Sequence, residues 1–568
     1  MNANANIAAR LTETARQLAK QHAIVSPPRK LDFFSRINRA FNGVDIFGRD
    51  QPRKALWLNF EQLDIFIHQI ARGLKCYHIL PPMRTIVMVP PGINFVAYSF
   101  ALFRLGAVPV LIDPGMGMRN LGTCIGDASP GAFIGSSLAH WARRLFGWGS
   151  SSIRIKLQVN ELGTWALNDD CEFVLDYAIE ADDVDVCQRQ DSDLAAILFT
   201  SGSTGPAKGA VYTHGMFQEQ VRVMREVFGI EPGEVDLCTF PLFALFAPTL
   251  GMTSIVPDMD PTRPAKADPK KLIKAIFDYQ VTNLFGSPAL IDVLSRYGEK
   301  HDIRLPTLRR VISAGAPAPA AVIERMAKML NPGVQVFTPY GATECLPIAV
   351  IGSDEILGET RHKTDQGAGI CVGRPVGRIE VRIIPIDDGP ILTPPHPPLL
   401  RGGEIGEITV RGQVVSQSYW NLPDADALHK IPDGDTVWHR TGDIGYFDDI
   451  GRLWFCGRKA HRVILPEQTL FTIPVEGVFN VHPDVFRTAL VGAVKNGVKR
   501  PVLCVELEKQ CRRKPRDIVP ELEAIRDRFP HIAAIRDFLF HSGFPVDIRH
   551  NAKINREKLA LWAARRLR

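Results

Sequence analysis

The sequence lacks the features that define several large classes of protein. No apolar run approaches the roughly 18 residues that a membrane-spanning helix needs. The longest candidate, around residues 95–103, is bounded by Pro90, Pro91 and Arg104. The first residues have neither the charged start nor the apolar stretch of a secretory signal. We therefore expect no membrane span and no export signal.

Closely spaced cysteines and common hydrolase motifs are missing as well. The ten cysteines are scattered, and the nearest pair is Cys504 and Cys511, so no C-x-x-C motif indicates zinc or a thioredoxin-like site. G-x-S-x-G and H-E-x-x-H are also absent, which argues against an ordinary serine hydrolase or a zinc protease. Scattered thiols are typical of a reduced compartment, and we expect a cytoplasmic protein.

Charge of one sign is not in strong excess. The 568 residues carry 67 Lys and Arg against 61 Asp and Glu, a net charge of +6 that is too dilute to indicate nucleic-acid binding. Hydrophobic residues make up 45% and charged residues 23%, which is typical of a globular chain. The length indicates about two to four domains.

Short β-branched runs alternate with helical patterns over much of the chain. Near-continuous apolar strands between helices indicate parallel sheets covered on both faces, and so an α/β fold. The expected strands are residues 85–90, 107–113, 193–200, 281–285 and 310–314, and a helix is expected over 319–330. At the N-terminus, Ile7, Leu11, Ala15 and Leu18 follow helical spacing. They predict a surface helix, with docking on a partner as the alternative.

The predicted secondary structure changes in the last third of the chain. From about 376 to 457 strands and turns dominate, including a predicted hairpin over 446–455. After a predicted hinge at 458–462, residues 463–568 form a separate α+β unit. It holds a hairpin with Asn496-Gly497 at its turn, a pair that favours positive φ angles, and a charged helix over 519–528.

A loop rich in glycine and hydroxyl groups follows the strand that ends at Phe199. Glycines allow close backbone approach to a polyphosphate, hydroxyls and amides supply donors, and Lys208 adds a positive charge. A nucleoside triphosphatase P-loop is excluded, because the fifth residue after Gly202 is Ala207 rather than glycine. The candidate phosphate-binding residues are Thr200, Ser201, Gly202, Ser203, Thr204, Gly205 and Lys208.

This loop, T-S-G-S-T-G-x-x-K-G, resembles the phosphate loop of the adenylate-forming superfamily, which includes acyl-CoA synthetases, peptide-synthetase adenylation domains and firefly luciferase. The resemblance covers almost the whole chain, since later segments resemble the family's other motifs in order. These are residues 313–317 (adenine loop), 339–344 (aromatic-plus-acid motif), 440–445 (ribose motif), 457–458 (hinge) and 551–556 (terminal lysine motif).

The resemblance implies a role for each motif, with ATP and Mg²⁺ as cofactors. Tyr340 offers a face for adenine stacking, and Glu344 supplies a hard oxygen ligand for Mg²⁺. Asp443 accepts hydrogen bonds from the ribose hydroxyls, and Arg458 donates there. Lys553 stabilises charge at the α-phosphate, so Lys553, Lys208 and Glu344 form the implied catalytic set. The implied nucleotide site also includes Gly315, Ala316, Pro317, Gly341, Ala342 and Thr343.

The implied fold is α/β, with a large N-terminal AMP-binding domain at 1–457 and a small mobile α+β lid at 463–568. The larger domain is expected to hold two doubly wound sheets and a small β-barrel subdomain at about 376–457. The nucleotide would bind between domain and lid, on either side of the hinge at 458–462.

The segment after the hinge bears on the second step of the reaction that the resemblance implies, in which a nucleophile attacks the acyl-adenylate. Thioester-forming relatives carry a glycine there, where backbone must lie close to a pantetheine arm. No glycine lies between Gly457 and Glu476, and the family's charged hinge pair is replaced by Ala460-His461. A β-hydroxy acid would need no tunnel for a pantetheine arm, because its own hydroxyl can close a four-membered ring on the activated carboxyl. A shifted loop that still serves CoA is the alternative.

Residues 210–217, 240–246, 256–264 and 341–347 further resemble the olefin β-lactone synthetase branch of this superfamily. That resemblance implies a long-chain 2-alkyl-3-hydroxyalkanoic acid as substrate and assembly with other olefin-pathway enzymes. The apolar run at 240–246, with Ala244 at the expected pocket position, is either an acyl pocket or a buried strand end. His214 is either a phosphate contact or a structural histidine. The rival functions are a long-chain fatty acyl-CoA or acyl-carrier ligase and a non-catalytic nucleotide-binding scaffold.

Overall fold

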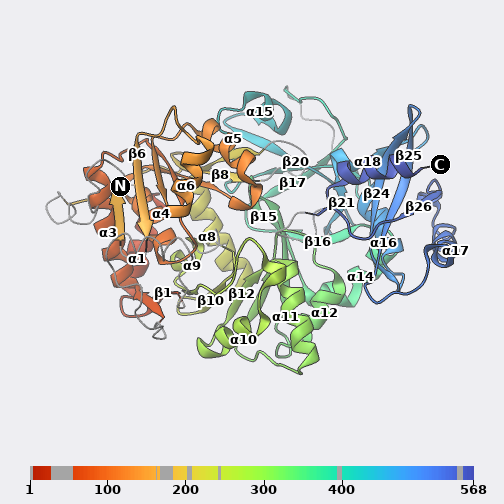
Figure 1. The fold of residues 1–568 in the computed structure, drawn as a ribbon, viewed down its shortest axis with the longest axis horizontal. Coiled ribbons are helices and arrows are strands. Elements are labelled where there is room, and N and C mark those ends of the chain that lie inside the picture. The colour runs from red at the N-terminus through yellow and green to blue at the C-terminus, as the bar shows by residue number, and fades with distance from the viewer. Residues whose placement is uncertain are drawn as a thin grey trace.

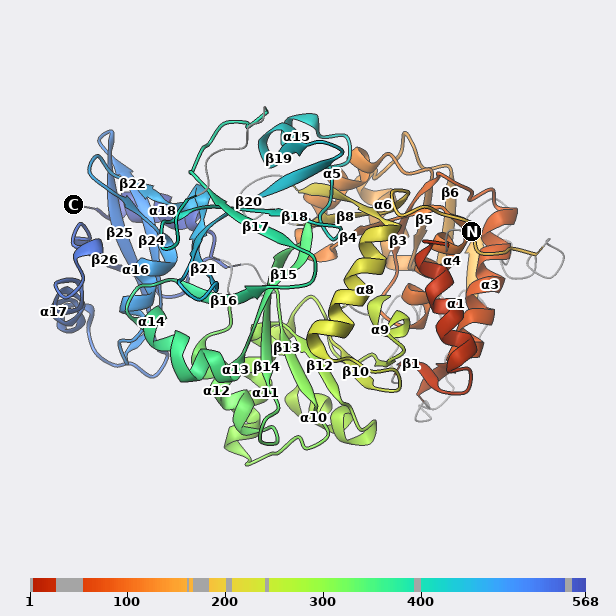
Figure 2. The ribbon, with the colours of Figure 1, turned by 180° about the vertical axis from the view of Figure 1, so that it is seen from behind.

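The computed structural model describes residues 4–26, 55–160, 163–166, 183–200, 207–240, 245–392, 400–546 and 554–567. Figure 1 and the opposite view in Figure 2 show three regions along the long axis of the molecule. The N-terminal elements, drawn red to orange, lie at one end, the green central elements follow, and the blue C-terminal elements form the other end.

The first sheet has seven strands, in the order β7-β6-β5-β3-β4-β8-β9. The five central strands run parallel, and β7 and β9 pair antiparallel at the edges. The predictions at 85–90, 107–113 and 193–200 are confirmed. The bounds are β3 (Arg84–Met88), β4 (Val108–Ile112), β5 (Ala132–Gly135), β6 (Ile155–Asn160), β7 (Gly163–Ala166), β8 (Leu194–Thr200) and β9 (Lys208–Thr213), with α4 (Ile93–Leu105), η1 (Pro114–Met116), α5 (Met118–Ala128) and α6 (Ser137–Phe146) between them.

The second sheet contains a run of parallel strands, β13-β12-β10-β11-β1, with β14 parallel to β13. Strands at 281–285 and 310–314 and the helix at 319–330 are confirmed within a few residues. The strands are β1 (His22–Ser26), β2 (Leu56–Asn59), β10 (Val235–Cys238), β11 (Thr253–Ile255), β12 (Asn283–Gly286), β13 (Arg310–Ser313), β14 (Val336–Ala342) and β15 (Cys345–Gly352). The helices are α3 (Phe60–Cys76), α8 (His214–Phe228), α9 (Phe246–Thr249), η3 (Pro264–Lys266), α10 (Pro269–Asp278), α11 (Pro288–Lys300), α12 (Ala320–Lys328), α13 (Ser353–Glu355), η4 (Ile356–Thr360) and α14 (Arg361–Asp365).

The β-rich region expected at 376–457 is present, but it continues the second sheet. Its strands pair in the order β17-β18-β20-β21-β16, and β16 pairs with β15. Among the residues that the structure describes, this pairing stays open and does not close into the predicted barrel. The elements are β16 (Ile370–Pro375), β17 (Glu380–Ile384), β18 (Gly406–Arg411), α15 (Pro423–His429), β19 (Lys430–Asp433), β20 (Thr436–Phe447) and β21 (Leu453–Arg458).

The C-terminal residues form a small α+β unit whose strands pair in the order β24-β25-β26. Asn496 and Gly497 adopt φ values of 52° and 76° at the β24–β25 turn, as the sequence predicts. Its elements are η5 (Lys459–His461), β22 (Val463–Ile464), β23 (Thr469–Leu470), α16 (Thr472–Phe479), β24 (Val485–Lys495), β25 (Val498–Leu507), α17 (Pro515–Arg526), η6 (Pro530–Ile532), β26 (Asp537–Phe540) and α18 (Arg556–Arg566). Two apolar clusters consist wholly of residues from 463 onward.

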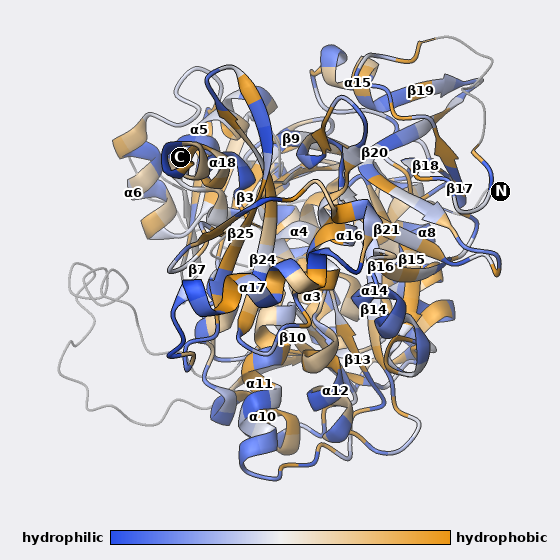
Figure 3. Cartoon of the chain, turned by 90° about the vertical axis from the view of Figure 1, so that its right-hand side faces the viewer, coloured by the Kyte–Doolittle hydropathy of each residue, from blue (hydrophilic) through white to orange (hydrophobic). Residues whose placement is uncertain are grey.

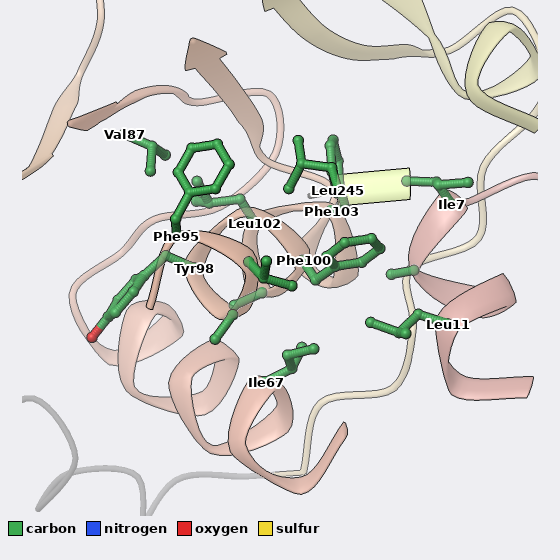
Figure 4. Close-up of a cluster of buried hydrophobic side chains, with 14 of the residues drawn as sticks. Ile7, Leu11, Ile67, Val87, Phe95, Tyr98, Phe100, Leu102, Phe103 and Leu245 are labelled. Carbon is green, nitrogen blue, oxygen red and sulfur yellow. The ribbon is translucent and has the colours of Figure 1, made fainter. Parts of the chain in front are cut away.

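The N-terminal helix α1 (Ile7–Gln17) packs into the largest apolar core. Asn6 caps it by accepting a hydrogen bond from the backbone of Ala8. Figure 4 shows Leu11 pointing toward Ile67 and Phe100, and Leu11 is 2% exposed. The apolar face of α1 is thus covered by the chain itself, so the alternative of partner docking through this face is wrong.

No helix among the described residues is long and apolar enough to cross a membrane. The nine cysteines in the described part of the chain are free thiols. Burial raises the pKa of most of them, for example that of Cys124 to about 12, so these thiols stay protonated and unreactive near neutral pH.

Candidate functional site

The predicted phosphate loop joins two paired strands. β8 and β9 are antiparallel, with Thr200 opposite Lys208, so the loop leaves and re-enters the sheet at one edge. Residues 201–206, which include the predicted Ser201–Gly205 set, lie outside the described residues. Burial lowers the pKa of Lys208, and its Nζ lies 2.7 Å from Nε2 of His429. The lysine is therefore directed inward, toward the second sheet.

The predicted adenine loop follows β13. Gly315 has a φ of +98°, a left-handed conformation that glycine adopts without strain, and Ala316 and Pro317 continue the turn. Ile312 pairs with Phe337 in parallel register, and β14 extends beyond that point to Ala342. The loop and the end of β14 thus lie at the same edge of the sheet.

Tyr340, Asp443 and Arg458 meet in one hydrogen-bonded group. The Tyr340 hydroxyl donates to Asp443 Oδ2 at 2.6 Å, and Arg458 Nε lies 3.0 Å from Asp443 Oδ1. Burial, and then the Asp443 charge, raises the pKa of Tyr340 well above its usual value, while Asp443 raises that of Arg458. The carboxylate is therefore held between a neutral hydroxyl and a permanent cation. The three residues come from β14, β20 and β21, and a carboxylate fixed in this way can accept hydrogen bonds from a diol.

Glu344 lies in the tight turn between β14 and β15, where Ala342 pairs with Cys345. Its Oε1 accepts a hydrogen bond from the Tyr419 hydroxyl at 2.7 Å. A Cβ at Gly341 would come within 2.7 Å of the Cys345 carbonyl oxygen, so a side chain there would push the turn apart. Thr343 is held by its carbonyl, which accepts from the Tyr212 hydroxyl. Contacts at Gly341, Thr343 and Glu344 thus fix the turn that carries Glu344.

A second group of residues, which sequence reasoning missed, connects Lys208 to Glu344. Lys208 Nζ and Lys430 Nζ lie 5.1 and 5.2 Å from the centre of the Tyr419 ring. Burial lowers the pKa of His429 to about 4, so its ring is neutral and Nε2 can accept from Lys208. The other ring nitrogen, Nδ1, lies 3.3 Å from the Arg440 carbonyl oxygen. Tyr419 therefore has cations over its ring and a carboxylate at its hydroxyl.

Backbone pairing explains how Tyr419 reaches this position. Ala210 of β9 forms a bridge with Tyr419, and Trp420 donates its N–H to the Gly209 carbonyl at 2.8 Å. The segment before α15 thus lies along β9 and joins the two sheets beside the phosphate loop. Tyr419 is far from both Lys208 and Glu344 in the sequence, so no spacing pattern could have indicated the contact.

The donors present fit a magnesium ion that is held mainly by phosphates. Among the described residues, no group of three or more His, Cys, Asp or Glu side chains could hold a metal ion by itself. Mg²⁺ commonly binds through one or two carboxylates together with substrate phosphates and water. Glu344, fixed by Tyr419, is a carboxylate of this kind.

Lys553 lies outside the described residues, and the helix that follows it, α18, is held within the C-terminal unit by Arg556. Arg556, the first residue of α18, bonds to both oxygens of Glu476, with Nη2 at 2.9 Å from Oε2. Its Nη1 also donates to the Leu490 carbonyl at 3.0 Å. Glu476 is 6% exposed, so this is a buried ion pair within the C-terminal unit.

Two open interpretations are partly resolved. His214 is 1% exposed, and its Nδ1 accepts a hydrogen bond from the Ile7 N–H at 3.3 Å. It therefore has a structural role at the start of α1. For the apolar run at 240–246, residues 241–244 lie outside the described residues. β10 ends at Cys238 and α9 begins at Phe246, on either side of these residues, so the acyl pocket and the buried strand end both stay predictions.

Comparisons with known proteins agree with this geometry. The family model described as "AMP-binding enzyme" matches residues 44–420. The chain is 48% identical over its whole length to the olefin beta-lactone synthetase of Stenotrophomonas maltophilia, with 99% of that relative covered. It is 47% identical to that of Xanthomonas campestris pv. campestris, covering 98% of this chain and 97% of the relative. A long-chain-fatty-acid–CoA ligase of Escherichia coli is 30% identical over 60% of this chain and 59% of its own.

Solved structures share the fold at low sequence identity. The amide bond synthetase of Marinactinospora thermotolerans aligns with a TM-score of 0.76 at 19% identity, covering 98% of this chain and 99% of the other. The o-succinylbenzoate coenzyme A synthetase of Bacillus subtilis, in complex with ATP and magnesium ion, aligns with a TM-score of 0.72 at 20% identity, covering 97% and 98%. With a family model that spans most of the chain and two full-length relatives near half identity, the chain belongs to the AMP-binding enzyme family.

Proposed function

We propose that this protein is a β-lactone synthetase. It would activate a long-chain 2-alkyl-3-hydroxyalkanoic acid with ATP and then close the product to a β-lactone. The observation that carries the proposal is the 48% identity over the full length to a curated olefin beta-lactone synthetase. Relatives named as fatty-acid–CoA ligases match at 30% over little more than half the chain.

The chemistry has two steps. In the first, a carboxylate oxygen of the substrate attacks the α-phosphorus of ATP, and pyrophosphate leaves. In the second, the 3-hydroxyl oxygen attacks the acyl carbon of the adenylate, AMP leaves with the bonding electrons, and the hydroxyl proton is released. Holding the hydroxyl near the acyl carbon makes this step intramolecular, which can contribute about 7–11 kcal/mol.

The described residues support the first step. Asp443, held by Tyr340 and Arg458, is suited to accept from the ribose hydroxyls. Lys208 lies beside the phosphate loop and supplies positive charge. Glu344 would hold Mg²⁺, which offsets phosphate charge when bound. We assign Lys553 to the α-phosphate, and the phosphate contacts to residues 200–205, on the family resemblance.

The second step fits the segment after the predicted hinge. No glycine lies between Gly457 and Glu476, and residues 463–470 pair as a small hairpin, β22 with β23. Leu465 donates to the Gln468 carbonyl at 2.9 Å, which closes the turn of this hairpin. A compact hairpin with side chains at every position is suited to a reaction that needs no pantetheine channel. Mg²⁺ dependence, a cytoplasmic location and assembly with other olefin-pathway enzymes belong to the same proposal.

The test is mass spectrometry of the products from a synthetic 2-alkyl-3-hydroxy acid with ATP and Mg²⁺. We expect a product whose mass is that of the acid less one water, together with AMP and pyrophosphate. The matched substrate without the 3-hydroxyl should support pyrophosphate exchange into ATP but give no lactone. Asp443→Asn should raise the KM for ATP at least tenfold, whereas Asp449→Asn, at an exposed turn, should not.

Two outcomes would overturn the proposal. Formation of a thioester from CoA and a plain fatty acid, without lactone from the hydroxy acid, would identify an acyl-CoA ligase. No exchange of labelled pyrophosphate with any acid of a broad panel would indicate a nucleotide-binding scaffold.

A further inference from the structure

Helix α6 exposes its large apolar residues and buries its small ones. Leu138, Trp141 and Leu145 are 47%, 53% and 59% exposed, while Ala139 and Ala142 are buried. The three exposed positions are spaced i, i+3 and i+7, so they share one face of the helix. A surface helix ordinarily shows the reverse arrangement, with its apolar stripe toward the core.

The inner face of α6 is fixed by specific contacts, so the helix cannot simply rotate. His140 is 5% exposed, and its Nε2 lies 3.0 Å from the Leu157 carbonyl oxygen. Its ring packs edge-on against Phe133 with centroids 4.9 Å apart. Burial lowers the pKa of His140 to about 4, so it is a neutral donor to Leu157. The fold therefore requires this orientation, and the apolar stripe stays outside.

Neighbouring side chains extend the stripe into a larger apolar ridge. Phe146 is 50% exposed and stacks on the buried Trp148, with ring centroids 5.7 Å apart and planes at 21°. Met118, at the start of α5, is 43% exposed. A hollow of about 680 Å³ lies between these elements and is lined by Met118, Phe146 and Trp148. Figure 3 shows α6 at the margin of the molecule. The ridge comprises Met118, Leu138, Trp141, Leu145 and Phe146.

The chain around the ridge is strongly basic. Residues 114–160 contain a single acidic side chain, Asp127, against five basic ones, whereas the whole chain is nearly balanced. Three of the basic residues, Arg119, Arg144 and Arg154, are exposed. Exposed Trp, Leu and Phe beside Arg is the composition of helices that lie in the interface of an anionic membrane.

We propose that the ridge docks this protein on an anionic lipid surface, with α6 lying in the plane of the headgroups. The apolar side chains would enter the boundary of the acyl chains, and the arginines would reach phosphate groups, each contributing through the negative surface potential. A second copy of the chain is a poorer occupant, because two such faces would bring like charges together.

The location suits a lipid-like substrate. α5 and α6 follow the carboxyl ends of β4 and β5, and β8 runs into the predicted phosphate loop at that same edge of a parallel sheet. A docked enzyme could take a long-chain acid directly from the lipid phase. This purpose rests on the proposed function, but the docking itself does not.

The experiment is co-sedimentation of the full chain with vesicles of phosphatidylcholine containing phosphatidylglycerol, and with vesicles of phosphatidylcholine alone. We expect binding to the anionic vesicles that weakens as salt rises. The double variant Trp141→Ser/Leu145→Ser should lose at least tenfold in vesicle affinity, and Arg119→Gln/Arg144→Gln should lose about tenfold or more. Ile450→Ser, at a 58% exposed position of the β20–β21 turn, is the matched control and should bind like the parent.

Light scattering and the lactone assay complete the test. The Trp141→Ser/Leu145→Ser variant should keep its molecular mass and its lactone formation from detergent-dispersed acid, which separates failed docking from a failed function. The proposal is overturned if the parent binds neither vesicle, or binds both equally well. It is also overturned if the variant binds like the parent, or if it changes the molecular mass instead, which would mark an interface between copies.

Discussion

The Tyr419 side chain contacts both Lys208, which follows the predicted phosphate loop, and Glu344, the candidate magnesium ligand. The ammonium groups of Lys208 and Lys430 lie 5.1 and 5.2 Å from the centre of its ring, and its hydroxyl donates to Glu344 at 2.7 Å. Burial, and then the Glu344 charge, raises the pKa of Tyr419, so the hydroxyl stays protonated as a donor. A charge-assisted hydrogen bond of this kind is worth about 1.5–3 kcal/mol.

We expect Tyr419→Phe to weaken the use of magnesium and ATP. Without the hydroxyl, Glu344 loses the donor that fixes one of its oxygens, so the proposed metal ligand becomes less well placed. The KM for Mg-ATP in pyrophosphate exchange should rise about 10- to 100-fold, as the hydrogen-bond energy implies. The circular dichroism spectrum should stay unchanged, because the ring and its packing remain.

Tyr446→Phe is the matched control. The Tyr446 hydroxyl donates to the Ala368 carbonyl at 2.9 Å, a contact that involves neither Glu344 nor Tyr419. This change removes one partly buried hydrogen bond and leaves the contacts of Glu344 intact, so the KM should stay within about twofold. Equal effects of the two substitutions would show that Tyr419 acts only through stability.

At the scale of elements, α1 is held mainly by its apolar face. Leu11 is 2% exposed and lies in the core that α3 and α4 share. We expect Leu11→Ala to lower the free energy of unfolding of this region by about 2–5 kcal/mol, because it leaves a cavity that the neighbours fill only in part. The midpoint of denaturation by urea, followed by tryptophan fluorescence, is the measurement.

The same substitution at an exposed helical leucine provides the comparison. Leu561 on α18 is 64% exposed, so Leu561→Ala should change the free energy of unfolding by no more than about 0.5 kcal/mol. A similar small effect of Leu11→Ala would mean that α1 detaches readily from the core.

The elements that the sequence predicted are those with a strong local signal. The strands at 85–90, 107–113 and 193–200 are apolar over nearly their whole length because both faces of their sheet are covered, and the Asn496-Gly497 turn needs the positive φ that it shows. The helix expected at 519–528 instead begins at Pro515, because proline is well tolerated in a first turn. Whether the β-rich region at 376–457 closes into a barrel depends on which distant strands pair, and no local sequence pattern encodes that pairing.

The residues of the candidate site also divide into those that a local motif predicts and those that only the fold brings together. Motif residues such as Tyr340, Asp443 and Arg458 could be named from resemblance, and the structure brings them together. Lys208 contacts His429 and Glu344 contacts Tyr419, and these two partners are far away in the sequence and belong to no recognised motif. Such pairs arise only when two sheets meet, so they needed the fold.

At the scale of the whole molecule, the C-terminal unit has its own core and a polar contact with the rest. Its two apolar clusters contain no residue before Val463. Near the predicted hinge, Lys459 Nζ lies 3.1 Å from Glu407 Oε2, and Arg462 lies 2.6 Å from the exposed Asp388. Asp388 is 68% exposed, so its pair with Arg462 is worth little, typically below about 1 kcal/mol, whereas the Glu407 carboxylate is buried. This arrangement supports the proposal of a lid that changes position, since neither apolar cluster of the unit includes a residue of the larger domain.

If the lid delivers Lys553 to the α-phosphate, then removing that side chain should affect chemistry and spare ATP binding. A cation directed at charge that develops in the transition state contributes about 2.7–4 kcal/mol, or 10²- to 10³-fold in rate. We therefore expect Lys553→Ala to slow pyrophosphate exchange at least 100-fold, while the Kd for ATP from calorimetry stays within about threefold. Lys558→Ala, at an exposed position of α18, should leave both quantities unchanged. A parallel loss of ATP affinity with normal turnover would place Lys553 in ground-state binding and would remove the reason for a moving lid.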